Sequence, residues 1–141
     1  MKKIHALSVA TVISLIIASC SGSSTPSQST DTSTAAAKPS GADIYNKTCV
    51  ACHQANGEGL PGTFPPLAKS DFLTDKEKTI GQVLKGFSGE LVVNGKKFNN
   101  TMPAQQLTDD EIASVLTYVY TSFGNSGSPV TADEVKAIRS K

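Results

Sequence analysis

The sequence predicts a mostly α domain over residues 41–141, with about four helices and one small β-hairpin. Three Thr-x-x-Glu patterns indicate helix starts, because the threonine hydroxyl and the glutamate carboxylate each accept a hydrogen bond from an otherwise unpaired backbone N–H. These patterns are Thr74/Glu77, Thr108/Glu111 and Thr131/Glu134. The apolar residues of the expected elements are few for a domain of this length. We therefore expect a large apolar ligand to complete the core.

The first half of the domain is expected to hold two helices. The first covers residues 41–52 and the second covers residues 75–85, where Gly86 ends it. Residues 56–67 between them contain three glycines and three prolines, so they predict an irregular but rigid loop. The second helix is expected to turn its apolar side chains inward: Ile80, Val83 and Leu84.

The second half begins with the one segment that favours strands. Asn94-Gly95 joins two short extended runs and favours a type I′ turn, which predicts a small hairpin. The clearest helix then covers residues 109–123, and Gly124 is suited to its left-handed end. Its apolar residues recur at helical spacing on one face: Ile112, Val115, Leu116, Val119 and Phe123. A last helix is expected over residues 132–139.

Residues 1–19 read as an export signal. Two lysines precede an apolar run of about 15 residues, which is typical of a secretory signal and short of the about 20 residues that cross a membrane. Residues Ile17-Ala18-Ser19-Cys20 resemble a bacterial lipobox. The resemblance implies cleavage before Cys20, lipidation of Cys20, and an exported domain anchored by lipid to a bacterial membrane. An ordinary signal peptide and an uncleaved anchor are the alternatives.

Residues 20–40 are expected to form a lipidated flexible tether. Eleven of residues 21–40 are Ser or Thr, and none is Val, Ile, Leu, Phe, Tyr or Met, so the segment has nothing to bury. The domain that follows carries little net charge, as does the whole chain at +1. A near-neutral chain lacks the broad basic field that nucleic-acid binding usually needs, so no nucleic-acid partner is expected.

One motif carries chemistry: Cys49-Val50-Ala51-Cys52-His53, the C-x-x-C-H pattern of covalent haem c attachment. Two cysteines on one helical turn can reach the two vinyl groups of a porphyrin, and the next residue can direct its imidazole at the iron. Three other interpretations exist. A thioredoxin-like pair needs a β-α-β context, a zinc site needs a fourth ligand, and a plain disulfide leaves His53 without a role.

The second axial ligand follows by elimination. Once residues 1–19 are removed, His53 is the only histidine and Met102 the only methionine. Met102 precedes Pro103, which fixes the backbone of the loop before the 109–123 helix. His/Met ligation raises the reduction potential of a haem, because a thioether favours Fe(II). A core-filling or merely exposed Met102 is the alternative.

With these residues in place, the domain resembles a class I cytochrome c, a fold of about four helices around one covalently bound haem. The resemblance implies that Pro65 accepts a hydrogen bond from His53 and that Leu67 packs on the haem. It also implies a helix crossing at Gly41 and Tyr45, met by Val115 and Tyr118. Residues 98–100, Phe-Asn-Asn, depart from the family's frequent Tyr-Asn-Gly, which removes a tyrosine hydroxyl from this part of the pocket.

The expected function is that of a one-electron carrier between membrane-associated respiratory partners. The sequence resembles small periplasmic cytochromes that serve haem-copper oxidases or copper nitrite reductases. No catalytic residue stands out and no small-molecule substrate is expected. The alternatives are a peroxidase-like haem enzyme or gas sensor with a displaceable sixth ligand, and a fixed electron-transfer subunit of a larger oxidoreductase.

Overall fold

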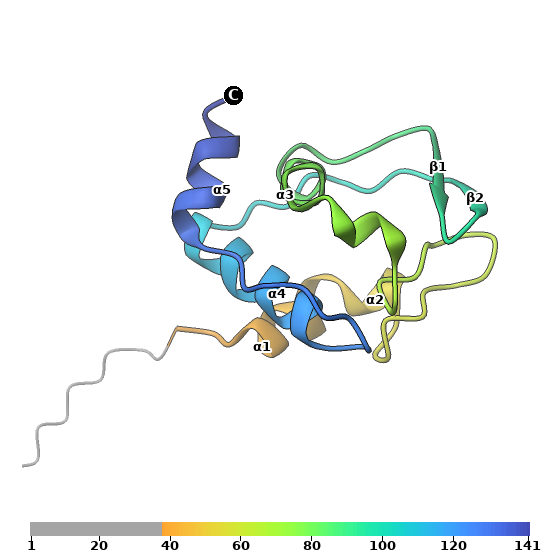
Figure 1. The fold of residues 1–141 in the computed structure, drawn as a ribbon, viewed down its shortest axis with the longest axis horizontal. Helices are drawn as coiled ribbons and strands as arrows, with labels where there is room; N and C mark the ends of the chain where they lie inside the picture. The colour runs from red at the N-terminus through yellow and green to blue at the C-terminus, as the bar shows by residue number, and fades with distance from the viewer. Residues whose placement is uncertain (1–37) are drawn as a thin grey trace, which may run out of the picture. The chain divides into compact units, whose positions relative to one another are not determined.

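A computed structural model of the chain describes residues 38–141 (Figure 1). Over this range it contains five α-helices, one 3₁₀ helix and one two-stranded antiparallel sheet. The mostly α fold class is therefore confirmed. The expected signal, Cys20 and nearly all of the expected tether lie outside the described residues.

The first helical region consists of two helices, α1 (Gly41–Thr48) and α2 (Val50–His53). The expectation of one continuous helix over residues 41–52 is wrong at Cys49, whose φ of −108° departs from helical geometry. The backbone tightens there, because the N–H of Cys52 donates to the carbonyl of Cys49 at 3.2 Å, three residues back. This break lets α2 leave the axis of α1.

A 3₁₀ helix (η1, Asp71–Thr74) precedes α3 (Lys76–Lys85). The expected capping role of Thr74 is wrong, because its hydroxyl donates to the carbonyl of Asp71 at 2.7 Å inside the 3₁₀ turn. Asp75 caps α3 instead and accepts a hydrogen bond from the N–H of Lys78 at 3.0 Å. Gly86 ends α3 as predicted, with φ of +75°.

The predicted hairpin is present as β1 (Glu90–Val93) and β2 (Lys96–Asn99). Asn94 and Gly95 both have positive φ, 49° and 72°, as a type I′ turn requires. Val93 and Phe98 are buried. The hairpin lies at the side of the domain opposite α5 (Figure 1).

The two C-terminal helices are α4 (Asp109–Thr121) and α5 (Ala132–Arg139). Their predicted capping boxes, Thr108/Glu111 and Thr131/Glu134, are both complete. The structure adds a third box, Ser40 with Asp43, at the start of α1.

The expected end of α4 at Phe123 is two residues too late. Ser122 is already extended, and Phe123 takes the left-handed conformation, with φ of +56°, before Gly124 does the same. This turn places the Phe123 ring 5.2 Å from the Tyr45 ring and 5.6 Å from the Tyr118 ring, between centroids. Aromatic packing at these distances offsets the cost of a left-handed phenylalanine.

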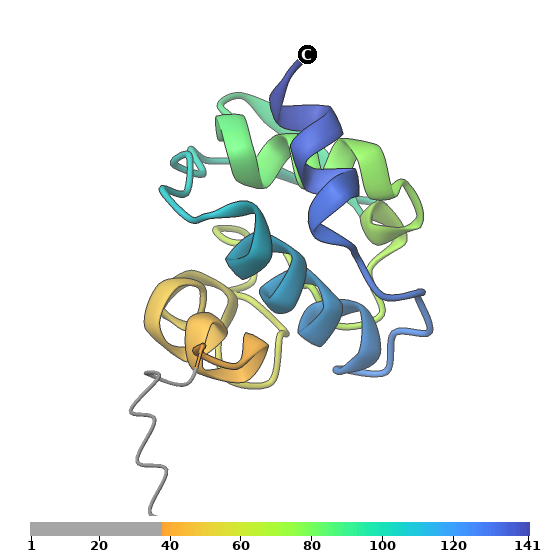
Figure 2. The same cartoon turned by 90° about the vertical axis from the view of Figure 1, so that its left-hand side faces the viewer.

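Helix α4 is the centre of the packing. It contacts α1 along one side and α3 and α5 along the other (Figure 2). A Cβ added to Gly41 would lie 2.8 Å from the Cβ of Tyr118, so only glycine allows α1 this close to α4. The implied helix crossing is therefore present. The buried core consists of Ile44, Tyr45, Leu73, Ile80, Ile112, Ala113, Val115, Leu116, Val119, Tyr120, Val130 and Val135.

Candidate cofactor site

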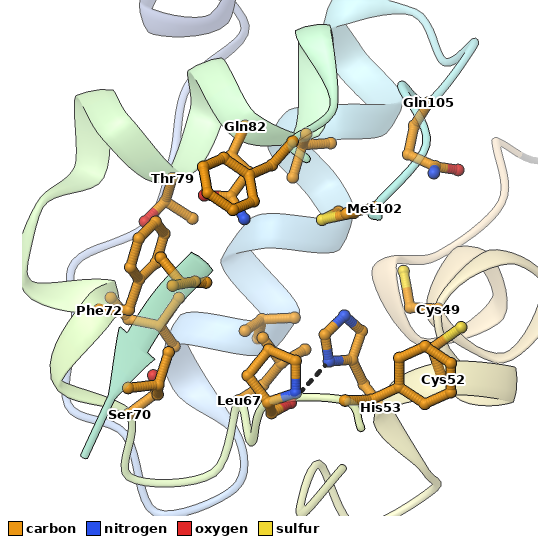
Figure 3. Close-up of a pocket in the computed structure, with 18 of the residues that line it drawn as sticks. Cys49, Cys52, His53, Leu67, Ser70, Phe72, Thr79, Gln82, Met102 and Gln105 are labelled. Atoms are coloured by element: carbon orange, nitrogen blue, oxygen red, sulfur yellow. Dashed lines mark hydrogen bonds between the residues drawn. The ribbon is translucent and has the colours of Figure 1, made fainter. Parts of the chain in front are cut away.

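All the residues that the sequence predicts for cofactor binding line one pocket (Figure 3): Cys49, Cys52, His53, Pro65, Leu67 and Met102. Helix α2, the 56–67 loop and the segment after the hairpin bring them together. The remaining wall is mainly apolar and comes from η1, α3, the hairpin, α4 and the loops beside them. Its larger apolar members are Phe64, Phe72, Leu73, Val83, Phe87, Leu91, Val93, Phe98, Leu107, Val115, Leu116 and Val119.

His53 is oriented by the backbone of the proline loop. Its Nδ1 lies 3.0 Å from the carbonyl oxygen of Pro65, the hydrogen bond that the resemblance implies (Figure 3). Burial lowers the pKa of His53, and the Pro65 bond opposes that shift. A neutral imidazole that donates through Nδ1 keeps the lone pair on Nε2, which is the form that binds a metal.

Backbone hydrogen bonds fix the loop that carries Pro65. The carbonyl of Gly57 accepts from the N–H groups of Leu67 and Ala68, at 2.7 and 2.8 Å. Gly59 is left-handed, with φ of +66°, and a Cβ there would lie 2.6 Å from the Pro65 oxygen. The tight approach of this glycine is thus part of what positions the carbonyl facing His53.

Met102 is held by an isolated antiparallel bridge to the residue after Gly86. The N–H of Met102 donates to the carbonyl of Phe87, and the N–H of Phe87 donates to the carbonyl of Met102, both at 2.8 Å. Figure 3 shows the Met102 side chain on the side of the pocket facing His53. The two side chains therefore approach the same space from opposite walls.

Cys49 and Cys52 are half-buried free thiols. Burial, and then the neighbouring Cys52, raise the pKa of the Cys49 thiol to about 11. Across residues 38–141, no three His, Cys, Asp or Glu side chains gather as metal ligands. The sheet in that range is a two-stranded hairpin that follows the motif. Within these residues, the zinc interpretation therefore lacks a cluster of metal ligands, and the thioredoxin-like interpretation lacks the β-α-β unit that it needs.

Sequence reasoning missed part of the pocket. Phe72 and Phe87 line it, as do the polar residues Ser70 and Gln82. The aromatic wall could have been predicted, because the apolar core is small and several phenylalanines lie outside the expected helices. Nothing in the spacing of Ser70 or Gln82 distinguishes them from solvent-facing residues.

The fold and the pocket define a small single-cofactor redox domain. An apolar pocket that offers two thiols, an oriented neutral imidazole and a thioether fits one covalently attached haem. Residues 39–122 match the model of the Cytochrome c family. The chain therefore belongs to the cytochrome c family; it is a class I, mono-haem electron-transfer protein that carries one haem c.

Curated relatives agree with this placement. Cytochrome c-552 of Thermus thermophilus is 42% identical over 118 residues, which span 76% of this chain and 79% of the relative. The fructose dehydrogenase cytochrome subunit of Gluconobacter japonicus is 31% identical over 107 residues, 70% of this chain but 22% of that subunit. The alcohol dehydrogenase (quinone) cytochrome c subunit of Komagataeibacter europaeus is 33% identical over 103 residues, with the same shares.

Proposed function

We propose that Cys49 and Cys52 hold the haem through thioether bonds and that His53 and Met102 are its two axial ligands. The observation that carries this proposal is the convergence of all four side chains on one apolar pocket. The His53–Pro65 hydrogen bond and the Phe87–Met102 bridge support it, because each fixes one of the two opposed ligands before the iron is bound.

With both axial positions filled, the protein acts as a one-electron carrier. The haem iron supplies the Fe(III)/Fe(II) couple. The chain's own residues set its surroundings: Pro65 orients the imidazole and strengthens its donation, Met102 favours the reduced iron, and the phenylalanines exclude water. No position is left for a substrate, which disfavours the peroxidase-like and gas-sensing alternatives.

Spectroscopy tests the ligand assignment. The oxidised protein should show the weak long-wavelength methionine–iron charge-transfer band, and Met102→Ala should abolish the band and allow carbon monoxide to bind the reduced haem. Val83→Ala, a pocket-wall change at a residue that cannot ligate, should keep the band. A wild-type protein that lacks the band and binds carbon monoxide readily would instead favour the enzyme or sensor alternative.

The partners proposed for the carrier are membrane-associated respiratory proteins, such as a terminal oxidase or a nitrite reductase. A fixed electron-transfer subunit is the second candidate, because several relatives are cytochrome subunits of dehydrogenases. Purification from native membranes in mild detergent separates the two. A carrier should elute as a free small protein, whereas a subunit should elute with a stoichiometric larger partner.

The membrane association is proposed to depend on a lipid at Cys20. Within residues 38–141 no helix is long and apolar enough to cross a membrane, and the lipobox resemblance at residues 17–20 supports a lipid anchor. Replacing residues 1–20 with a cleavable export signal should release the haem protein from membranes with an unchanged spectrum. Continued sedimentation with membranes would show that a different anchor operates.

A further inference from the structure

The loop that carries Pro65 has no N–H donor next to the carbonyl that His53 contacts. Pro65 and Pro66 are consecutive prolines, and a proline has no backbone N–H to donate. The next N–H along the chain belongs to Leu67. The orientation of the Pro65 carbonyl therefore depends on how the backbone at Leu67 is held.

Both backbone groups of Leu67 are hydrogen-bonded. Its N–H donates to the carbonyl of Gly57 at 2.7 Å, within the loop itself. Its carbonyl accepts from the side-chain amide of Asn125 at 2.9 Å, a residue 58 positions further along the chain. In the described part of the chain, this is the only hydrogen bond that joins residues 55–68 to a residue outside 53–68. The hydrogen-bonded link between this loop and the helical core is thus a single side chain.

Asn125 is itself fixed by the end of α4. Its amide has two hydrogens, and the second is donated to the carbonyl of Val119 at 2.9 Å. Val119 lies in the last turn of α4, where backbone carbonyls have no partner within the helix. The left-handed pair Phe123 and Gly124 turns the chain back, so that the Asn125 side chain reaches this carbonyl. One amide therefore caps α4 and holds the proline loop at the same time.

The histidine end of the contact is held by a different side chain. The hydroxyl of Tyr45 donates at 2.7 Å to the carbonyl of Gln54, the residue directly after His53. This bond fixes the backbone beside the imidazole without involving the proline loop. The two ends of the His53–Pro65 hydrogen bond therefore have separate supports, and Asn125 supports the Pro65 end.

We infer that Asn125 is a positioning residue for the axial histidine: by holding Leu67, it keeps the Pro65 carbonyl within hydrogen-bonding distance of the His53 Nδ1. The inference rests on the role of His53 as an iron ligand that is proposed above. A carbonyl held against Nδ1 strengthens the electron donation of the imidazole, which favours Fe(III). Asn125 does not line the pocket, yet it lowers the reduction potential of the cofactor inside it.

Asn125→Ala in the full-length holoprotein tests the inference. The variant removes both amide donors, so the Leu67 carbonyl is released and the Pro65 carbonyl is less firmly held. A redox titration should then show a higher reduction potential than that of the wild type. In the reduced protein, NMR should show the His53 Nδ1–H exchanging with solvent several-fold faster, because the hydrogen bond that protects it opens more often.

Thr117→Val is the matched control. Thr117 also lies on α4 and also makes two side-chain hydrogen bonds to a distant backbone. Its hydroxyl accepts from the N–H of Val130 at 2.9 Å and donates to the Val130 carbonyl at 3.2 Å, and neither residue lines the pocket. Urea unfolding should show a loss of stability in Thr117→Val and in Asn125→Ala alike. Only Asn125→Ala should change the reduction potential and the Nδ1–H exchange of His53.

A double-mutant cycle with Gly59→Ala tests whether Asn125 acts through Pro65. A Cβ at Gly59 would lie 2.6 Å from the Pro65 oxygen and must displace it. If both changes act on the same contact, the double variant should shift the reduction potential by less than the sum of the two single shifts. Fully additive shifts would show that Asn125 acts by another route and would overturn the inference.

A wild-type reduction potential and wild-type Nδ1–H exchange in Asn125→Ala would also overturn it and leave Asn125 as a helix cap only. If Asn125→Ala does not incorporate haem, Asn125→Asp serves instead, because it keeps the shape of the side chain without an N–H donor. Its Nδ1–H exchange should be faster than that of the wild type, and an unchanged rate would have the same meaning. A failure of the ligand assignment is seen separately, because the wild-type His53 signals would then lack the large ring-current shift of an axial ligand.

Discussion

The backbones of Phe87 and Met102 are joined by two reciprocal hydrogen bonds of 2.8 Å. This bridge links the end of α3 directly to the proposed methionine ligand. Gly86 makes the approach possible, since it is left-handed and a Cβ on it would lie 2.7 Å from the Met102 carbonyl oxygen. The position of the ligand therefore depends on a residue with no side chain to contribute.

Gly86→Ala should loosen the Met102 loop. The added methyl must push the Met102 carbonyl away, so we expect a weaker methionine–iron band and faster carbon monoxide binding to the reduced protein. Gly95→Ala is a matched control, because Gly95 is also left-handed, with φ of +72°, but a Cβ there would meet nothing within 4 Å. Both changes strain a backbone with positive φ by about 1–3 kcal/mol, and at Gly86 the ψ of −177° also lies in a region that is essentially confined to glycine. Equal spectra for the two variants would contradict the positioning role of Gly86.

Gly59→Ala should disturb the hydrogen bond to His53. A Cβ at Gly59 would lie 2.6 Å from the Pro65 oxygen, which must then move away from Nδ1. A less strongly held imidazole donates less to the iron, so the reduction potential should rise relative to the wild type. Redox titration measures the shift. Gly62→Ala is the control, because Gly62 has a similar φ and an added Cβ would meet nothing within 4 Å. If Gly62→Ala and Gly59→Ala had the same reduction potential, the prediction would be wrong.

Gly41→Ala should separate α1 from α4. Its methyl would meet the Tyr118 Cβ at 2.8 Å, and such overpacking typically costs about 1–3 kcal/mol of folding free energy. Gly81→Ala should have the opposite sign, because Gly81 lies inside α3 with its nearest neighbour 3.9 Å away, and alanine is the better helix former by about 1 kcal/mol. Urea unfolding of the holoprotein measures both; a stabilised Gly41→Ala would be inconsistent with the crossing described.

The capping boxes should make stability fall in acid. Hydrogen bonds from Thr108 lower the pKa of Glu111, and hydrogen bonds from Thr131 with Lys76 lower that of Glu134. Because the folded pKa lies below the ordinary value of 4.5, this stabilisation is present above pH 4.5 and is lost as the pH falls through the folded values.

Glu111→Gln and Glu134→Gln test this pH dependence. Each should be less stable than the wild type at pH 7 and should lose less stability on acidification, as followed by thermal unfolding between pH 7 and pH 3. Glu77→Gln is the control, since Glu77 belongs to the Thr-x-x-Glu pattern that does not cap a helix here. An acid response of Glu111→Gln identical to that of the wild type would exclude the cap as its source.

The sequence predicted most of the site because its chemistry is carried by rare residue types. His53 and Met102 are the only histidine and the only methionine among residues 20–141, so elimination sufficed to predict both as ligands, and both line one pocket. The Phe87–Met102 bridge escaped prediction because backbone hydrogen bonds place no demand on side-chain type. The position of Gln82 in the pocket wall was not predicted either, because a polar side chain on a helix is usually expected to face solvent.

A helix start was predicted correctly where the threonine hydroxyl is free to cap, and wrongly where a preceding turn uses it. Thr108 and Thr131 both form complete capping boxes and start helices, although Thr108 is also followed by an aspartate. Thr74 is followed by Asp75, and the aspartate prevails because the threonine hydroxyl is already used within the 3₁₀ turn. The early end of α4 at Thr121 depends on Phe123 packing against Tyr45, a contact between distant parts of the chain.

The crossing of α1 and α4 also has a consequence for the order of folding. Gly41 and Tyr118 stand near the two ends of the family-matched region, so their contact closes a loop that contains both the cysteine motif and the methionine segment. Contacts between residues far apart in sequence form slowly, since the entropy of closing the loop must be overcome first. Until α4 packs against α1, the segment that holds the two cysteines and the methionine is not yet enclosed, so we expect the pocket to be completed late in folding.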